Sequence, residues 1–231
     1  MPPPSPVSPG LWLRQRRTSA QRCVRKALFD QSQARLAAQA AAAAGLEAAA
    51  QLVNAHLTAR YAPDWPLPAA VAAVEGLAEA VAAKLFARGC AAASALRASL
   101  ERLAAAQRAL EEALAAVTAE LQPSAGADEG EGERAAQLVV YTGLQLLEFD
   151  ALAAEVVAMH AAELERKRRI AEALLALFEP PPLAREGGAP PPPSRDQLTV
   201  WLRAWKLAPS LDSRRLEAIE AQWRAEIESA G

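Results

Sequence analysis

The sequence predicts an all-α protein: an elongated antiparallel bundle of three long, coiled-coil-like helices with a short C-terminal helical hairpin. Hydrophobic residues make up 52% of the 231 residues and recur every three or four positions, which is the spacing of one helix face. Pro and Gly gather in a few short segments that mark helix ends. Alanine dominates the apolar residues and aromatic residues reach only 5%, so each helix buries little area per residue and long contacts are needed.

The N-terminal segment, residues 1–18, is expected to be a disordered, basic and Pro-rich tail, and the first helix is expected over residues 19–60. Thr18 and Ser19 are good helix caps. Val24, Leu28 and Leu36 fall on one face of the predicted helix. The first 29 residues contain no acid and six basic side chains: Arg14, Arg16, Arg17, Arg22, Arg25 and Lys26.

This basic composition leaves three interpretations open. The segment is a tail followed by the start of a helix, an organelle transit peptide, or a basic contact for an acidic partner.

Two further long helices are predicted, over residues 69–121 and 134–178, on either side of a flexible acidic loop at 122–133. The 69–121 helix carries an apolar seam with heptad spacing, which is typical of coiled-coil packing. Its members are Val74, Leu77, Val81, Leu85, Leu96, Leu100, Leu103, Leu110, Leu114, Val117 and Leu121.

Charges interrupt the apolar seam of the 134–178 helix. The same register that contains Phe149, Leu152, Val156, Met159, Ile170, Leu174 and Leu177 places Glu163 and Arg166 at apolar positions. Two interpretations follow: a stretch of helix that is exposed to solvent, or a stretch that meets the charges of another protein.

The C-terminal region is expected to be a Pro-rich linker at 179–194 followed by a helical hairpin at 195–231, with Ser194 as a cap and a second helix over 212–229. The linker is interpreted as a mobile spacer or as a ligand for a proline-recognition domain. Three of the five Trp residues, Trp201, Trp205 and Trp223, lie in this hairpin. We expect the hairpin to fold onto the bundle, or alternatively to fill a pocket of a partner.

Residues for catalysis are scarce. His56 and His160 lie on different helices, and no metal-ligand, nucleotide-binding or nucleophile motif occurs, so we expect no enzymatic activity, no cofactor and no metal. Cys23 and Cys90 are expected to be buried thiols in a reducing compartment.

The sequence predicts no membrane span, and the basic run at 166–169 is interpreted as a solvated helix face, a nucleic-acid contact or an import signal. The apolar tract Ala37–Ala44 is shorter than the ~20 residues of a spanning helix, so we expect a soluble protein. The basic run at 166–169 is flanked by Glu163, Glu165 and Glu172, which favours a solvated helix face, and the net charge of -2 argues against nucleic-acid binding.

Three collinear segments carry a resemblance to a known family. The string at 149–174, FDALAAEVVAMHAAELERKRRIAEAL, holds a pattern of Met159, Glu163-Leu164, Lys167-Arg168 and Ala171. LTVWL at 198–202 follows, with Asp212-Ser213-Arg214 and Leu216-Glu217, and Ala44-Gly45-Leu46 with Leu52-Val53-Asn54 precedes. These segments resemble the cyclin-dependent kinase 2-interacting protein family, whereas the long helix over 69–121 is more similar to the AIRIM family of helical ribosome maturation factors.

The resemblance implies a non-enzymatic adaptor of a tandem AAA ATPase complex that acts in pre-60S ribosome maturation and in replication and genome maintenance. The implied partners are a helical sister subunit, the AAA ATPase and a cyclin-dependent kinase, in the nucleus and cytoplasm. The alternative function is binding to a lipid surface through amphipathic helices. The candidate partner-binding residues are Met159, Glu163, Lys167, Arg168, Trp201, Leu202 and Trp205.

Overall fold

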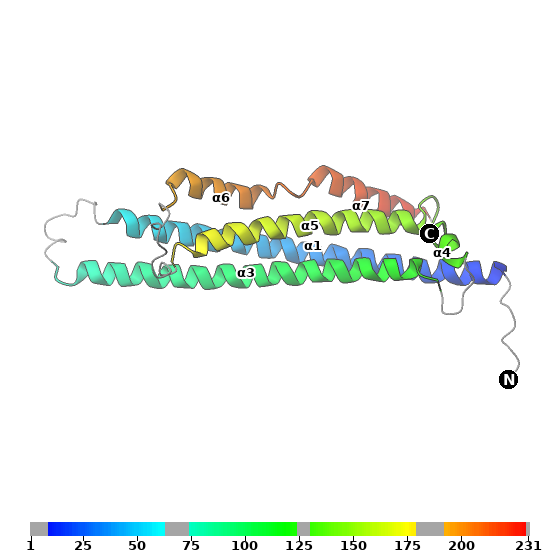
Figure 1. Cartoon of the computed structure of the whole chain (residues 1–231), viewed down its shortest axis with the longest axis horizontal. Coiled ribbons are helices and arrows are strands. Elements are labelled where there is room, and N and C mark those ends of the chain that lie inside the picture. Colours follow the sequence, from blue (N-terminus) through cyan, green and yellow to red (C-terminus); the bar gives the residue numbers. More distant parts are fainter. Residues whose placement is uncertain (1–8, 63–73, 124–129, 179–191, 230–231) are drawn as a thin grey trace, which may run out of the picture. The chain divides into compact units, whose positions relative to one another are not determined.

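A computed structural model describes residues 9–62, 74–123, 130–178 and 192–229. It confirms an all-α helical bundle that includes long helices (Figure 1). Within these residues Val139 and Gln145 form an isolated antiparallel bridge, and no longer strand occurs. The helices are α1 (Pro9–Tyr61), α3 (Leu77–Leu121), α4 (Glu131–Ala136), α5 (Leu146–Leu175), α6 (Arg195–Leu207) and α7 (Ser213–Glu228).

The chain divides into two compact units, and α1, α3 and α5 each contribute a segment to both. Unit 1 comprises Met1–Leu36, Ala106–Ala161 and Ser210–Gly231, and unit 2 comprises Ala37–Ala105 and Ala162–Pro209. This division differs from the predicted one, in which the two C-terminal helices formed one hairpin. Helix α6 belongs to unit 2 and α7 to unit 1, because each buries its Trp side chains against a different part of the long helices.

In unit 1 the helices run antiparallel around a common core. Hydrogen bonds between α1 and α3 join Ser19 to Glu120 and Cys23 to Ala116, and those between α3 and α5 join Gln107 to Val157 and Thr118 to Asp150. In each helix pair the residue numbers rise on one helix as they fall on the other. Helix α7 lies along α5 (Figure 1), with its Leu216, Ile219 and Trp223 in the core. Other fully buried members of this core are Val24, Val140, Leu146 and Phe149.

In unit 2 small residues let the helices approach closely. The hydroxyl of Ser99 on α3 donates to the carbonyl of Ala41 on α1 at 2.7 Å. Gly89 on α3 lies directly against the ring of Phe178, which also meets the imidazole of His56 edge-on at a centroid distance of 6.2 Å. The backbones of α1, at Ala41, and of α3, at Gly89, are therefore within reach of side chains from neighbouring segments.

The heptad seam predicted for α3 is buried only in part. Leu96, Leu103, Leu110 and Val117 are buried, as expected for packing positions. Val74 and Val81, at the other end of the predicted seam, are 54% and 42% exposed. The start of this helix also differs from the prediction: α3 begins at Leu77, after Gly76 adopts a left-handed φ of 74° that interrupts a helix. Residues 69–73 lie outside the described residues.

The predicted disordered tail is wrong for residues 9–18, which form the first turns of α1. Proline is well suited to the first position of a helix, and Pro9 occupies it. The Trp12 ring lies 5.5 Å from the guanidinium carbon of Arg134. Arg16 donates to the carbonyls of Glu120 and Gln122, so these turns are held by tertiary contacts that local sequence does not reveal. Residues 1–8 lie outside the described part.

The predicted helix over 134–178 is wrong in its first third. The chain forms α4, turns at Thr142 and Gly143, and begins α5 only at Leu146. Backbone hydrogen bonds from Val140 to Leu144 and from Leu146 to Leu138 close this turn, so the Thr-Gly pair acts as the breaker. The predicted acidic loop at 122–133 ends earlier than expected, because Glu131–Glu133 belong to α4. Residues 124–129 lie outside the described residues.

The two C-terminal helices start where the sequence predicts. Ser194 accepts a hydrogen bond from the Gln197 amide, and the Gln197 side chain accepts one from Ser194 N, which is a complete capping box. Asp212 caps α7 by accepting from the Arg215 amide. Residues 179–191 of the predicted linker lie outside the described residues.

The expectation of buried cysteines needs correction. Neither cysteine is fully buried: Cys23 is intermediate and Cys90 exposed. Burial, followed by the charge of Glu120, raises the pKa of the Cys23 thiol above its usual value. Within the described part of the chain, one helix, Gly10–Tyr61, is long and apolar enough to cross a membrane by length and composition. Core helices of soluble proteins pass the same test, and the expectation of no membrane span stays a prediction.

Glu226 on α7 fastens the turn at 142–143. Its carboxylate accepts hydrogen bonds at 3.0 Å from the amides of Thr142 and Gly143 and at 3.2 Å from the Thr142 hydroxyl. Burial by itself would raise the pKa of Glu226, but the backbone donors of Gly143, Thr142 and Leu144 and the hydroxyl outweigh it and lower the pKa below its usual value. Glu226 therefore stabilises unit 1 in its charged form.

Replacing Glu226 with Gln tests this contact. Because the pKa is lowered on folding, the stabilisation is present above the unfolded pKa of about 4.3 and is lost as pH falls through the folded pKa. We expect E226Q to lower the free energy of unfolding by about 1 kcal/mol at neutral pH, after allowance for partial solvent screening. Urea unfolding at a series of pH values measures the difference in free energy of unfolding between E226Q and the wild type. We expect this difference to shrink towards zero as the pH is lowered, and a difference that does not change with pH contradicts the assignment.

Candidate functional site

Of the two charges that interrupt the predicted seam, Glu163 lies in the interior of unit 2 and Arg166 is half-buried, while Lys167 beside them is also buried. Glu163 and Lys167 on α5 are only 4% and 2% exposed. They are one helical turn apart, and Lys167 Nζ donates to Glu163 Oε1. The expectation that this charged stretch forms a solvated helix face is therefore wrong for Glu163 and Lys167. A buried charge needs a counterion, and Glu163 and Lys167 serve as counterions for one another.

Helix α6 completes the surroundings of this ion pair. Lys167 Nζ donates to the backbone carbonyl of Trp205 at 3.1 Å and lies 5.5 Å from the centroid of the Trp205 ring. The ammonium group therefore has a carboxylate, a carbonyl and an aromatic face around it, which together replace water.

Trp205 in turn connects α6 to α1. It is 2% exposed, and its indole Nε1 donates to the carbonyl of Ala42 at 2.9 Å. A helix carbonyl that already bonds within its own helix retains a second lone pair and can accept this bond. The expectation that the Trp residues fold onto the bundle agrees with this position, whereas the alternative of a partner pocket does not hold for Trp205.

Gly45 makes room for this contact. A Cβ atom at Gly45 would lie within 2.5 Å of Trp205 Cζ2 and closer still to the hydroxyl oxygen of Ser99. Sequence reasoning missed the role of Gly45 and Ser99. The available signal was a single glycine within an otherwise Ala-rich helix, which usually has a packing reason.

The structure separates the candidate partner-binding residues into three groups. Glu163, Lys167 and Trp205 form one interior cluster in unit 2. Met159 belongs to unit 1, where it is half-buried and packs against the core. The remaining three have accessible surface: Arg168 is exposed, and Trp201 and Leu202 are half-buried.

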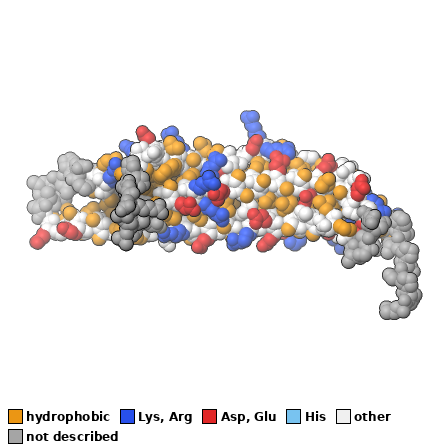
Figure 2. Space-filling model, in the orientation of Figure 1, with side chains coloured by type: hydrophobic (Ala, Val, Ile, Leu, Met, Phe, Trp, Pro, Cys, Tyr) orange, Lys and Arg blue, Asp and Glu red, His pale blue; other side chains and the backbone are white. Residues whose placement is uncertain are grey.

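The basic run at 166–169 therefore offers less charge than its sequence suggests. Lys167 faces the interior, and Arg169 pairs with Glu165 at 2.9 Å. Figure 2 shows acidic and basic side chains interspersed over the face in view.

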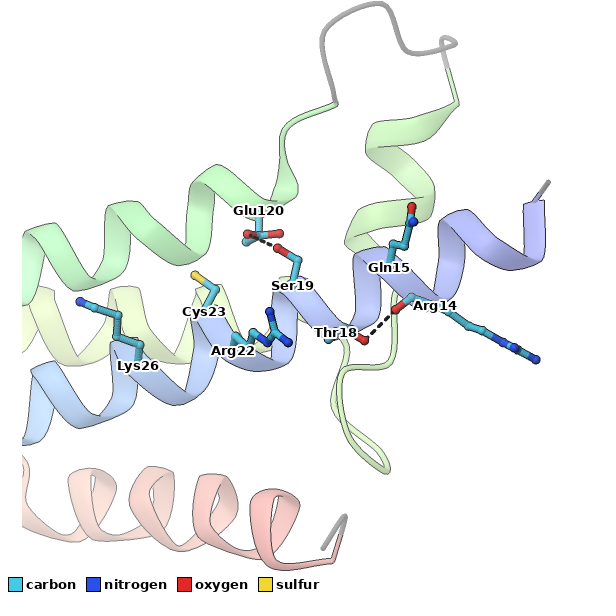
Figure 3. Close-up of a pocket in the computed structure, with 8 residues that line it drawn as sticks. All are labelled: Arg14, Gln15, Thr18, Ser19, Arg22, Cys23, Lys26 and Glu120. Carbon is cyan, nitrogen blue, oxygen red and sulfur yellow. Dashed lines mark hydrogen bonds between the residues drawn. The ribbon is translucent and has the colours of Figure 1, made fainter. Parts of the chain in front are cut away.

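The basic start of α1 is likewise divided between two roles. Arg16 and Arg17 donate to backbone carbonyls at the end of α3 and at Val140 and Tyr141. On the solvent side Arg14, Arg22 and Lys26 line an open groove of about 690 Å³ that Glu120 of α3 borders (Figure 3). Among the described residues no group of three or more His, Cys, Asp or Glu side chains is placed to hold a metal ion.

Removing one charge of the interior pair tests its burial. Lys167→Met leaves Glu163 without its ammonium partner, and we expect the free energy of unfolding to fall by about 3–5 kcal/mol. The double variant Glu163→Leu/Lys167→Met removes both charges and is expected to recover most of this loss. Urea unfolding of both variants measures the difference; equal stability of Lys167→Met and the wild type would mean that the pair is solvated.

Gly45→Ala tests the close approach of Trp205 and Ser99. The added methyl group overlaps both side chains, so we expect a loss of about 1–3 kcal/mol in the free energy of unfolding. Gly10→Ala on the same helix is the matched control, because nothing lies within 4 Å of its Cβ position. It is expected to be neutral or to stabilise the protein by up to about 1 kcal/mol through helix propensity. Thermal unfolding followed by circular dichroism compares them, and a stabilising Gly45→Ala contradicts the contact.

In comparisons with known proteins, no protein-family model and no curated protein matches the chain. The family suggested by the motif resemblance therefore stays a prediction.

Proposed function

We propose that this chain is a non-enzymatic adaptor that binds helical partner proteins. One observation supports the proposal. Helices α1 and α3 bury one set of apolar side chains in the core and carry further large apolar side chains that are exposed. Phe29 and Leu36 on α1 are 64% and 56% exposed, and Phe86 on α3 is 62% exposed. Exposed apolar side chains of this size at helical spacing are suited to packing against further helices.

The partners we propose come from the motif resemblance: a helical sister subunit and a tandem AAA ATPase, in pre-60S ribosome maturation and genome maintenance, with a cyclin-dependent kinase as a further partner. Of the candidate partner-binding residues within the resembling segments, Arg168, Trp201 and Leu202 are accessible. Glu163, Lys167 and Trp205 contribute to this function by holding α5 and α6 together, since their polar groups are used within unit 2.

Affinity purification from the source cell tests the proposal. We expect the tagged chain to recover an AAA ATPase and a helical sister chain, and we expect Trp201→Ala/Leu202→Ala to recover less of both at unchanged helix content. Leu207→Ala, at a 73% exposed position of α6 outside the resembling segments, is the control. Recovery of the chain without any AAA ATPase or helical sister chain contradicts the proposal.

A second candidate, binding to a lipid surface, is favoured by one observation. The helix Gly10–Tyr61 passes the length and composition test for a membrane span, and its first turns are basic. Vesicle sedimentation tests this candidate. A lipid-binding chain sediments together with vesicles of phosphatidylserine and phosphatidylcholine, whereas an adaptor that is fully packed in buffer stays in the supernatant.

A further inference from the structure

Helix α1 has two heptad seams on opposite faces, and unit 1 covers only one of them. The inner seam, Ala20, Val24, Ala27, Gln31 and Ala34, is buried. The outer seam, which we call the α1 stripe, alternates steps of four and three residues along the helix, the spacing of a coiled-coil contact. Its members, all exposed, are Leu11, Gln15, Thr18, Arg22, Arg25, Phe29, Ser32 and Leu36.

Apolar side chains lie towards both ends of the α1 stripe. Leu11 is 49% exposed, Phe29 64% and Leu36 56%. Leu36 was expected on the buried face with Val24, but it lies about 120° around the helix from Val24 and is exposed. Leu36 follows Phe29 by one heptad, so the two exposed side chains form successive anchor positions for a second helix.

The centre of the α1 stripe is positively charged. Arg22 and Arg25 belong to it, and Arg14 and Lys26 flank it along the groove that Figure 3 shows. Lys26 pairs with Asp30, the first acid of the sequence. Arg25 interacts with the Tyr141 side chain while remaining exposed. Among the described residues no carboxylate forms an ion pair with Arg14, Arg22 or Arg25.

We infer that the α1 stripe binds an acidic amphipathic α-helix of a partner protein. This inference rests on the proposed adaptor function and names the surface and the chemistry of its partner. The apolar residues of the partner helix pack against Leu11, Phe29 and Leu36, and its carboxylates face Arg22 and Arg25.

Other occupants fit the α1 stripe less well. A second copy of the chain, paired antiparallel so that Leu11 meets Leu36, would place Arg22 of one copy against Arg25 of the other, and like charges at the centre oppose such a pair. A lipid surface favours a broad apolar face, whereas here Gln, Thr, Arg and Ser share the same line with the apolar residues. Nucleic acid would meet the exposed Phe29 and Leu36 without complementary chemistry.

Peptide binding tests the inference on the full chain. The probe is a fluorescein-labelled synthetic helix with Leu at heptad positions a and d and Glu at e and g; its control carries Lys at e and g. We expect the Glu peptide to bind at least about tenfold more tightly than the Lys peptide, with an affinity that falls as salt rises. Arg22→Glu/Arg25→Glu should reverse this preference, and Phe29→Ser/Leu36→Ser should weaken both peptides by about tenfold or more.

A matched control separates the stripe from net charge. Arg214→Glu/Arg224→Glu makes the same charge change at exposed positions of α7 and should leave Glu-peptide binding unchanged. Equal loss in both charge variants overturns the inference. So does binding of the wild type to phosphatidylserine vesicles or duplex DNA without binding to the Glu peptide, as does concentration-dependent dimerisation that Phe29→Ser/Leu36→Ser abolishes.

The same variants distinguish this inference from the proposed function. If the AAA ATPase and helical sister chain co-purify equally with the wild type and with Arg22→Glu/Arg25→Glu, and the peptide does not bind, the stripe inference fails and the adaptor function stands. If the Glu peptide binds as expected but neither protein co-purifies, the assignment of those partners fails and the stripe inference stands.

Discussion

Close approach of helices with small side chains is the constraint on which the rest of this structure depends. Ala, Gly and Ser bury little area each, so the helices must come near enough for side chains of one to reach the backbone of another. Donors use the spare lone pairs of backbone carbonyls throughout: Ser99 to Ala41, Trp205 to Ala42, Cys23 to Ala116, Gln107 to Val157 and Arg17 to Val140. These bonds give specificity to interfaces that apolar packing alone would leave poorly defined.

The same constraint explains why charged residues can lie inside unit 2. Lys167 has three donors and needs acceptors at short range, which Glu163 and the Trp205 carbonyl supply. Because these groups are used internally, the surfaces left for other proteins are the exposed outer faces, such as that of α1. The fold separates the residues that hold its helices together from those left at the surface, even where the two alternate in sequence.

Periodicity predicts what is local and averaged over many residues. It identified the all-α class and packing positions such as Leu96 and Leu103, while the residue type of Ser194 predicted the cap of α6. It missed contacts between residues distant in sequence: Arg16 at the end of α3, which orders the first turns of α1, and Glu226 at the Thr142–Gly143 turn. It also assumed that charge implies exposure. Glu163 and Lys167 violate that assumption because each is the counterion of the other.

Gly45 has a consequence for how this sequence can drift over time. The hydroxyl of Ser99, the indole of Trp205 and the missing side chain at position 45 share one small volume. A larger residue at position 45 is compatible with folding only if position 99 or position 205 becomes smaller in the same lineage. These three positions, on three different helices, should therefore change together among relatives, and their joint identity would mark which relatives dock α6 in the same way.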